Sequence, residues 1–224
     1  MIVAVLALGT SAFGQKNKGK ELQAAVDRVD KASAVMNEIM AVSDKSIPGD
    51  LLDKAKAIVI FPGAVKAGFI IGAQGGSGVA IRRIGKGWSA PAFMNMAGGS
   101  FGAQIGGQKT DYVLLIMNDK GLQGLLQDKF EMGGEGSVAA GPVGRTASAT
   151  TNATLDSEIL SYSRSKGLFA GISLKGVVIS ADNSINNGVY NKTATGVIGD
   201  PPMRSADAPG SLQRLAQTLS KYTK

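Results

Sequence analysis

The stretch Glu158-Ile-Leu-Ser-Tyr-Ser-Arg-Ser-Lys-Gly-Leu-Phe-Ala-Gly-Ile-Ser-Leu-Lys-Gly-Val-Val-Ile179 carries more structural information than any other part of the chain. From Leu168 onward its side chains alternate in character, which is the period-two pattern of a strand with one buried side. The buried side is predicted to consist of Leu168, Ala170, Ile172, Leu174 and Val178. Phe169, Ser173 and Lys175 would then lie on the opposite face.

The residues just before this predicted strand are basic and rich in hydroxyl groups. Arg164 and Lys166 stand among three serines, and Gly167 follows them. Glycine commonly marks a turn. We therefore expect a small basic loop at the end of a sheet.

The composition describes a folded domain with an unusual amount of glycine. The chain has 224 residues, which suits one substantial domain. It contains 31 glycines, about twice the usual share of roughly 7%. With 44% hydrophobic residues the chain is globular, and the glycines favour turns, bulges and closely packed strands over long helices.

Short apolar runs separated by glycines predict the strands of an antiparallel sheet. They cover residues 57–61, 68–73, 78–84, 88–95, 99–105 and 112–117. The last run is apolar on both faces, so we expect it at the centre of the sheet. Residues 131–151 are predicted to form two further strands or an ordered loop.

Helical spacing predicts an amphipathic helix over residues 20–42, with Leu22, Val26, Val29, Met36 and Met40 on one stripe. Its polar face mixes acidic and basic residues, which favours docking on the domain over lying on a membrane. Shorter helices are predicted at 51–56 and 118–129, and a short helix or turn at 182–191. The predicted fold class is therefore α+β: a glycine-rich antiparallel sheet, open or barrel-like, flanked by an N-terminal helix and short helices.

The two ends of the chain have patterns of their own. Residues 1–14 combine an apolar run with a small-residue end, which predicts a signal peptide and an exported protein, periplasmic or secreted; the alternative is a buried N-terminal strand. Residues 199–224 read as a linker and a short basic amphipathic helix, with Ser211 as its cap. The helix stripe of Leu212, Leu215, Ala216 and Leu219 would either dock on the domain or lie on a membrane.

The stretch quoted above resembles the signature of the SYLF domain family, and other motifs of that family follow in the same order. They are Ile47-Pro48 with Leu51-Leu52, Ala55-Lys56-Ala57-Ile58, Phe61-Pro62, Val65-Lys66-Ala67-Gly68, Trp88-Ser89-Ala90-Pro91, Gly98-Gly99-Ser100-Phe101-Gly102, Gln104-Ile105-Gly106-Gly107 and Ser137-Val-Ala-Ala-Gly-Pro-Val-Gly-Arg145. The resemblance runs from about residue 30 to about residue 198 and implies a SYLF-like domain over residues 15–198. It implies a lipid-binding module, with phosphoinositide and actin binding in eukaryotic members and secreted or envelope-associated proteins among bacterial ones.

The net charge of +7 favours an anionic partner. Nucleic acid is disfavoured, because aromatic residues make up only 5% of the chain and no basic tract is interleaved with them. The chain has no Cys and no His, which excludes a thiol nucleophile, a Cys/His zinc site and a Ser-His-Asp triad. We predict no catalytic residue, cofactor or metal. A small hydrolase using Ser163 and Lys166 is a third hypothesis, and it would have to work without His or Cys.

Three groups of basic residues are the candidate headgroup contacts. They are Arg82, Arg83 and Lys86; Lys54, Lys56 and Lys66; and Arg164 with Lys166. Each cation close to an anionic leaflet adds about 1 kcal/mol of attraction, so a converging set would give salt-sensitive attachment. The predicted function is non-enzymatic, peripheral binding of anionic phospholipid with phosphoinositide-like headgroups. The alternative is a protein-interaction or scaffold module of the cell envelope.

Overall fold

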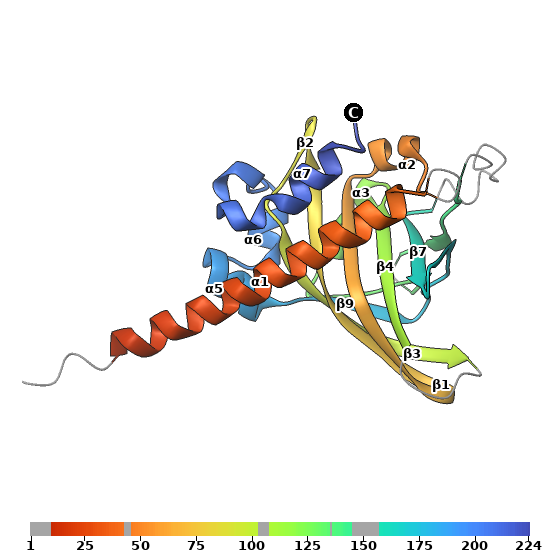
Figure 1. Ribbon diagram of the computed structural model, residues 1–224, viewed down its shortest axis with the longest axis horizontal. Coiled ribbons are helices and arrows are strands. Elements are labelled where there is room, and N and C mark those ends of the chain that lie inside the picture. Colours follow the sequence, from red (N-terminus) through yellow and green to blue (C-terminus); the bar gives the residue numbers. More distant parts are fainter. Residues whose placement is uncertain (1–9, 43–45, 103–107, 135, 145–156) are drawn as a thin grey trace, which may run out of the picture.

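A computed structural model of the chain describes residues 10–42, 46–102, 108–134, 136–144 and 157–224, without the side chains of 10–17, 68–71 and 100–102 (Figure 1). The helices are α1 (Thr10–Met40), α2 (Gly49–Lys54), α3 (Asp119–Leu125), α5 (Asn183–Tyr190), α6 (Ala194–Ile198) and α7 (Arg214–Ser220). The strands are β1 (Ala57–Ile84), β2 (Gly87–Trp88), β3 (Ala92–Gly102), β4 (Gln108–Ile116), β5 (Lys129–Glu131), β6 (Val138–Ala140), β7 (Ile159–Ser165), β8 (Leu168–Gly171) and β9 (Val177–Ala181).

The strands form one curled sheet, a half-barrel, in the order β5-β9-β3-β1-β4-β7-β6, with β2 paired to β1 and β8 paired to β7. All pairs are antiparallel except β6 with β7. The α+β class and the barrel-like sheet are therefore confirmed. The predicted central strand is also confirmed, because β4 lies between β1 and β7 and is buried from Tyr112 to Ile116.

β1 is a single long segment that folds back on itself, so that its two ends lie side by side (Figure 1). The N–H of Arg83, at its end, donates to the carbonyl of Lys56, just before its start, at 2.8 Å. Its first limb pairs with β4 and its second limb with β3. The runs predicted at 57–61 and 78–84 belong to these two limbs, and the run at 68–73 lies where they join.

Gly78 allows the two limbs of β1 to touch. A Cβ atom at this position would lie 2.3 Å from the carbonyl oxygen of Ile60 and 2.5 Å from Cδ1 of Phe61. Real Cβ atoms do not approach other atoms so closely, so only glycine fits without a shift of the backbone. The curvature of the sheet therefore depends locally on the absence of a side chain.

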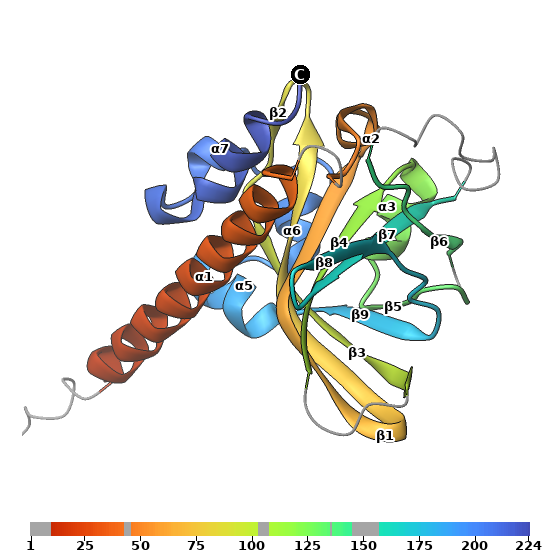
Figure 2. The ribbon, with the colours of Figure 1, turned by 45° about the vertical axis from the view of Figure 1, so that its right-hand side comes forward.

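α1 crosses one face of the sheet, and its N-terminal part projects from the body (Figures 1 and 2). The side chains that it buries are Ala25, Val29, Ala32, Val35, Met36 and Ile39. The buried stripe is rotated by part of a turn relative to the predicted one. Leu22 is 37% exposed, whereas Ala25 and Ala32 are buried. Small side chains let the helix pack closely, and hydropathy alone underrates them.

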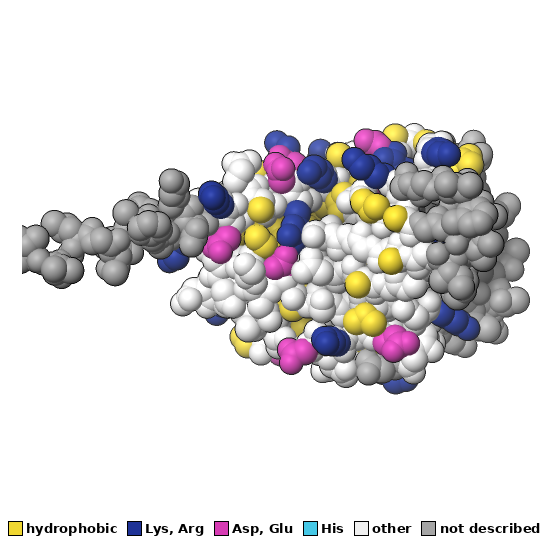
Figure 3. Space-filling view, turned by 90° about the horizontal axis from the view of Figure 1, so that it is seen from below, with side chains coloured by type: hydrophobic (Ala, Val, Ile, Leu, Met, Phe, Trp, Pro, Cys, Tyr) yellow, Lys and Arg dark blue, Asp and Glu magenta, His cyan; other side chains and the backbone are white. Residues whose placement is uncertain are grey.

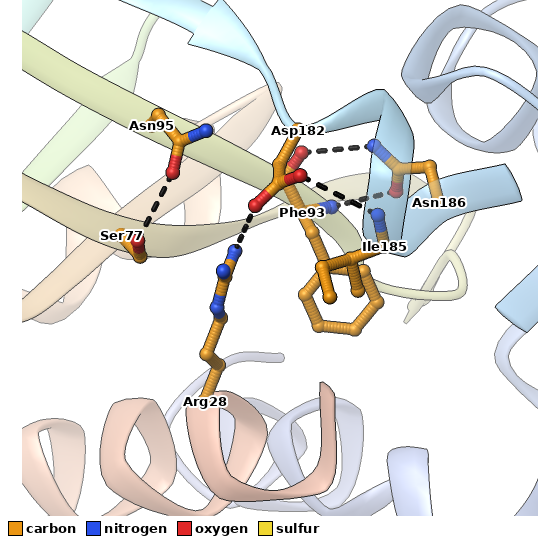
Figure 4. Close-up of polar contacts among 7 residues, drawn as sticks. All are labelled: Arg28, Ser77, Phe93, Asn95, Asp182, Ile185 and Asn186. Atoms are coloured by element: carbon orange, nitrogen blue, oxygen red, sulfur yellow. Dashed lines mark hydrogen bonds and ion pairs between the residues drawn. The ribbon is translucent and has the colours of Figure 1, made fainter. Parts of the chain in front are cut away.

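A polar network fixes the middle of α1 to the sheet (Figure 4). Nη1 of Arg28 lies 2.8 Å from Oδ2 of Asp182, whose other oxygen caps α5. In α5, Asn186 accepts from the N–H of Phe93 and donates to its carbonyl. Beside this network, Ser77 of β1 donates to Asn95 of β3 at 3.0 Å. The network therefore joins α1, α5 and β3 in one unit.

The C-terminal helix α7 docks on the domain. Leu212, Leu215, Ala216 and Leu219 are all buried, and α7 contacts α1. Arg214 pairs with Asp30 of α1 at 2.9 Å. Ser211 lies in a 3-10 turn before the helix, so it does not cap α7 as predicted. The apolar stripe is thus used within the domain and is not presented to a membrane.

The predicted signal peptide stays a prediction. Residues 1–9 lie outside the described part of the chain, and residues 10–14 belong to the first turns of α1. Among the described helices, none has the length and apolar character needed to cross a membrane.

Replacing Gly78 by alanine should destabilise the fold. The added methyl group would press on the Ile60 carbonyl and the Phe61 ring, and overpacking of this kind costs about 2 kcal/mol. Gly99→Ala is the matched control, because a Cβ at Gly99 meets no atom within 4 Å. Urea unfolding measures both free energies. Equal stability of the two variants would show that the limbs of β1 are not in close contact.

Candidate functional site

A tight turn joins β7 to β8. Ser165 pairs with Leu168, so Lys166 and Gly167 are the two turn residues. Both have positive φ, 50° and 78°, as a type I′ hairpin turn requires. Glycine adopts this backbone without strain, whereas lysine does so at a cost of roughly 1–2 kcal/mol. The predicted basic loop is therefore shorter than expected, with Arg164 inside β7.

The strand predicted from Leu168 to Val178 was wrong in extent, and wrong in orientation over its first residues, whereas Leu174 is buried as predicted. β8 ends at Gly171 and β9 begins only at Val177. Leu168, predicted to be buried, is 74% exposed. Phe169, predicted to lie on the outer face, is half-buried and stacks on Tyr162 with ring centroids 5.4 Å apart. In β8, the side chains predicted to be inside and outside are therefore exchanged.

Arg164 is the centre of an ion-pair cluster that joins four segments. Its Nη2 lies 3.0 Å from Oδ2 of Asp111 in β4, and its Nη1 pairs with Glu38 of α1. The other oxygen of Asp111 accepts from the N–H of Gly63, in the β-bulge of β1, at 2.8 Å. Burial acts to lower the pKa of Arg164, but hydrogen bonds and charge from Asp111 and Glu38 outweigh it and raise the pKa. Arg164 therefore holds the hairpin, the sheet and α1 together.

The predicted headgroup residues Arg82 and Arg83 are occupied within the fold. Arg82 donates to the carbonyls of Ile198 and Gly199 and pairs with Asp200 at 2.7 Å. Arg83 donates to the carbonyls of Leu52 and Ala55, and its guanidinium lies over the ring of Trp88 at 4.3 Å. Both guanidinium groups thus hydrogen-bond to backbone carbonyls of other segments and are not presented to a ligand.

The remaining predicted lysines divide between two ends of the molecule. Lys54, Lys56 and Lys86 are exposed near α2 and β2, beside Arg82 and Arg83, and Lys56 pairs with Asp119 at 3.3 Å. Lys66 lies at the other end, where it pairs in register with Gln108 of β4. Gln108 in turn donates to the hydroxyl of Ser165 in β7. Lys66, Arg164 and Lys166 are therefore brought together, and the other predicted cations are not.

Three exposed apolar side chains lie at this second end, and sequence reasoning missed them. Val42, Val65 and Leu168 are 52%, 48% and 74% exposed, and the described residues leave only one other large hydrophobic side chain exposed. Val65 pairs in register with Lys109, which is also exposed. The Lys109 carbonyl accepts from Ser165, the partner of Leu168. We call the set Val42, Val65, Lys109, Lys166 and Leu168 the hairpin-end surface.

A small pocket opens between the end of α1 and the β7–β8 hairpin. Its volume is about 120 Å³, and its apolar lining is Ile39, Val42, Leu168 and Phe169. Glu38 and Arg164, which pair with each other, complete the wall beside Gly167. The pocket is therefore continuous with the hairpin-end surface through Val42 and Leu168.

Two pockets of larger volume lie elsewhere: one of about 580 Å³ beside Trp88 and Arg204, and one of about 370 Å³ between α1 and α7. Seen from below, the middle of the surface is uncharged, and the Lys and Arg side chains around it are interspersed with Asp and Glu (Figure 3). Within the described part of the chain, no three His, Cys, Asp or Glu residues are grouped so that they could hold a metal ion. Ser163 lies inside β7 and Lys166 in the turn, so the pair lacks the helical setting that a serine–lysine hydrolase needs.

Arg164→Ala should lower the free energy of unfolding by about 2 kcal/mol, because it leaves the half-buried Asp111 carboxylate without its cation. Lys109→Ala is the matched control, since Lys109 is exposed, and it should change stability by no more than about 0.5 kcal/mol. Chemical denaturation compares the two variants. If they were equally stable, Arg164 would not be the link between the hairpin and α1.

Comparison with known proteins shows which family the chain belongs to. The family model described as Ysc84, Las17-binding protein actin regulator, matches residues 97–222. Protein YSC84 of Saccharomyces cerevisiae is 36% identical over 157 residues, 68% of this chain and 33% of the yeast protein. The human SH3 domain-containing YSC84-like protein 1 is 31% identical over 202 residues, 86% of this chain and 58% of the human protein. The chain thus spans only part of these relatives, and it belongs to the Ysc84 (SYLF) family.

Proposed function

We propose that this SYLF domain binds anionic phospholipid at a membrane surface, without catalysis, through the hairpin-end surface. The observation that supports this most is the pair of exposed apolar side chains Val42 and Leu168 at the rim of one pocket, with Lys166 in the adjoining turn. Exposed apolar side chains normally stand singly on a soluble protein. Apolar side chains ringed by cations suit the boundary between headgroups and acyl chains.

The energies of such a surface fit reversible attachment. Each lysine contributes about 1 kcal/mol near an anionic leaflet. Burying an exposed leucine side chain adds at most about 1.5–3 kcal/mol. Two kinds of signal, charge and insertion, are needed together for stable membrane binding. We therefore expect attachment that weakens with salt and with the loss of Leu168.

The headgroup contacts proposed here differ in part from those predicted from the sequence. Lys166 stays in the set and Lys109 joins it, whereas Lys66 is half-buried and follows Val65 in β1, so its side chain points to the opposite face of the sheet. Arg164 is no longer a headgroup contact, because its guanidinium pairs with Asp111 and Glu38 and so holds the hairpin in place. Arg82 and Arg83 are left out because backbone carbonyls and Asp200 occupy them.

A protein-interaction or scaffold module is the second candidate. The family description and the name of a yeast relative, LAS seventeen-binding protein 3, both refer to a protein partner. The pocket beside the exposed Leu168 could also receive an apolar side chain of another protein. The apolar run at residues 1–14 supports export to the periplasm or the outside as the compartment for either role.

Flotation of the full chain with vesicles tests the membrane proposal. We expect binding to vesicles that contain phosphatidylglycerol or phosphoinositide, weaker binding at high salt, and none to phosphatidylcholine vesicles. The double variant Lys109→Glu with Lys166→Glu should bind at least about 30-fold more weakly, because two attractions of about 1 kcal/mol each are lost. Leu168→Ser should weaken binding without removing the salt dependence.

The matched control is Lys129→Glu with Lys192→Glu, which makes the same change of charge on exposed lysines of β5 and of the segment after α5. Its binding should stay within a few-fold of the original chain. Equal losses in the two double variants would show that net charge, and not the hairpin-end surface, controls binding. No flotation with any vesicle would contradict the proposal and leave the protein-interaction module.

A further inference from the structure

The pocket beside the hairpin-end surface is apolar where it opens and polar only where charges are already paired. Val42 and Leu168 form its exposed rim, and Ile39 and Phe169 lie deeper. Glu38 and Arg164 pair with each other in its wall, so neither presents an unpaired charge to an occupant. Such a lining favours hydrocarbon over a polar or charged group.

The size of the pocket limits what it can hold. A pocket for a whole drug-sized ligand measures about 300–1,000 Å³. The volume here is about 120 Å³, which is room for a short hydrocarbon segment only. An occupant must therefore extend out of the pocket, with most of its mass beyond Val42 and Leu168.

Two exposed lysines belong to segments that border the pocket. Lys166 directly precedes Gly167, which lines the pocket, and the backbone carbonyl of Lys109 accepts from Ser165, the residue before Lys166. Lys166 also holds a left-handed backbone conformation, φ 50°, that asparagine or glycine would adopt at less cost. A strained residue next to a pocket is a reason to look for a function. Here that function would be to place a positive charge at the pocket mouth.

We propose that the pocket holds a segment of one acyl chain of an anionic phospholipid, with the phosphate of the same lipid facing Lys166. The inference rests on the proposed membrane function and adds a specific lipid site to it. Charge complementarity at the mouth and an apolar interior both select an anionic amphiphile. A headgroup without chains, or a neutral lipid, would satisfy only one of the two.

The test uses a soluble probe, dihexanoyl phosphatidylglycerol below its critical micelle concentration, added to the full chain. Methyl-labelled NMR spectra should show shifts at Ile39, Val42 and Leu168 that saturate with the lipid. Glycerol 3-phosphate, which has the charge without the chains, and dihexanoyl phosphatidylcholine should both bind at least about tenfold more weakly. Shifts confined to other methyl groups, or equal binding of glycerol 3-phosphate, would overturn the inference.

Val42→Trp separates the pocket from the membrane surface. Val42 is exposed beyond the end of α1, so a larger side chain narrows the pocket without entering the core. The added indole should maintain or increase vesicle flotation, since tryptophan favours the membrane interface. Binding of the soluble lipid should fall about tenfold or more. If this variant binds the soluble lipid as tightly as the original chain does, the lipid does not occupy the pocket.

The outcomes distinguish the two proposals. Flotation of the original chain without binding of the soluble lipid refutes the acyl-chain site and leaves the membrane function intact. If the original chain does not float with any vesicle, the membrane function and the acyl-chain site are both refuted. Both proposals are supported if the original chain floats and binds the soluble lipid, and if Val42→Trp abolishes only the binding of the soluble lipid.

Discussion

The ion-pair cluster of Arg164 with Asp111 and Glu38 is the interaction on which the rest of this end of the molecule depends. It joins β7 to the central strand β4, to the bulge of β1 through Gly63, and to the last turns of α1. Arg28, in the middle of the same helix, pairs with Asp182 at the start of α5, so α1 has two polar attachments to the rest of the domain. The pocket exists because these attachments hold α1 a fixed distance from the hairpin.

The sequence was a good guide to elements and a weaker guide to what their side chains do. The run at 112–117 predicted the central strand correctly because a two-sided strand must be apolar on both faces. By contrast, alternation placed Leu168 inside, because a short hairpin strand offers too few residues to identify which side is buried. The loop at Gly167 was predicted, but its two-residue length was not, since lysine is an unusual choice for a left-handed position.

The candidate site shows the same limit. Arg82 and Arg83 looked like ligand contacts because sequence shows a charge and not its partners. Those partners, the carbonyls of Gly199 and Leu52, lie 117 and 31 residues away along the chain. Lys109 was overlooked because its neighbour Val65 is distant in sequence and adjacent only after β1 and β4 pair. The hairpin-end surface thus arises from register between strands, which no local pattern records.

The depth of Leu168 in a bound membrane shows whether the β7–β8 hairpin inserts among the acyl chains. The chain has no cysteine, so Leu168→Cys provides a unique attachment point for a spin label or an environment-sensitive fluorophore. With phosphatidylglycerol vesicles, a label at this position should enter the acyl-chain region, while a label at Lys129→Cys stays in water. A label at position 168 that remains in water while the protein is bound would contradict the account.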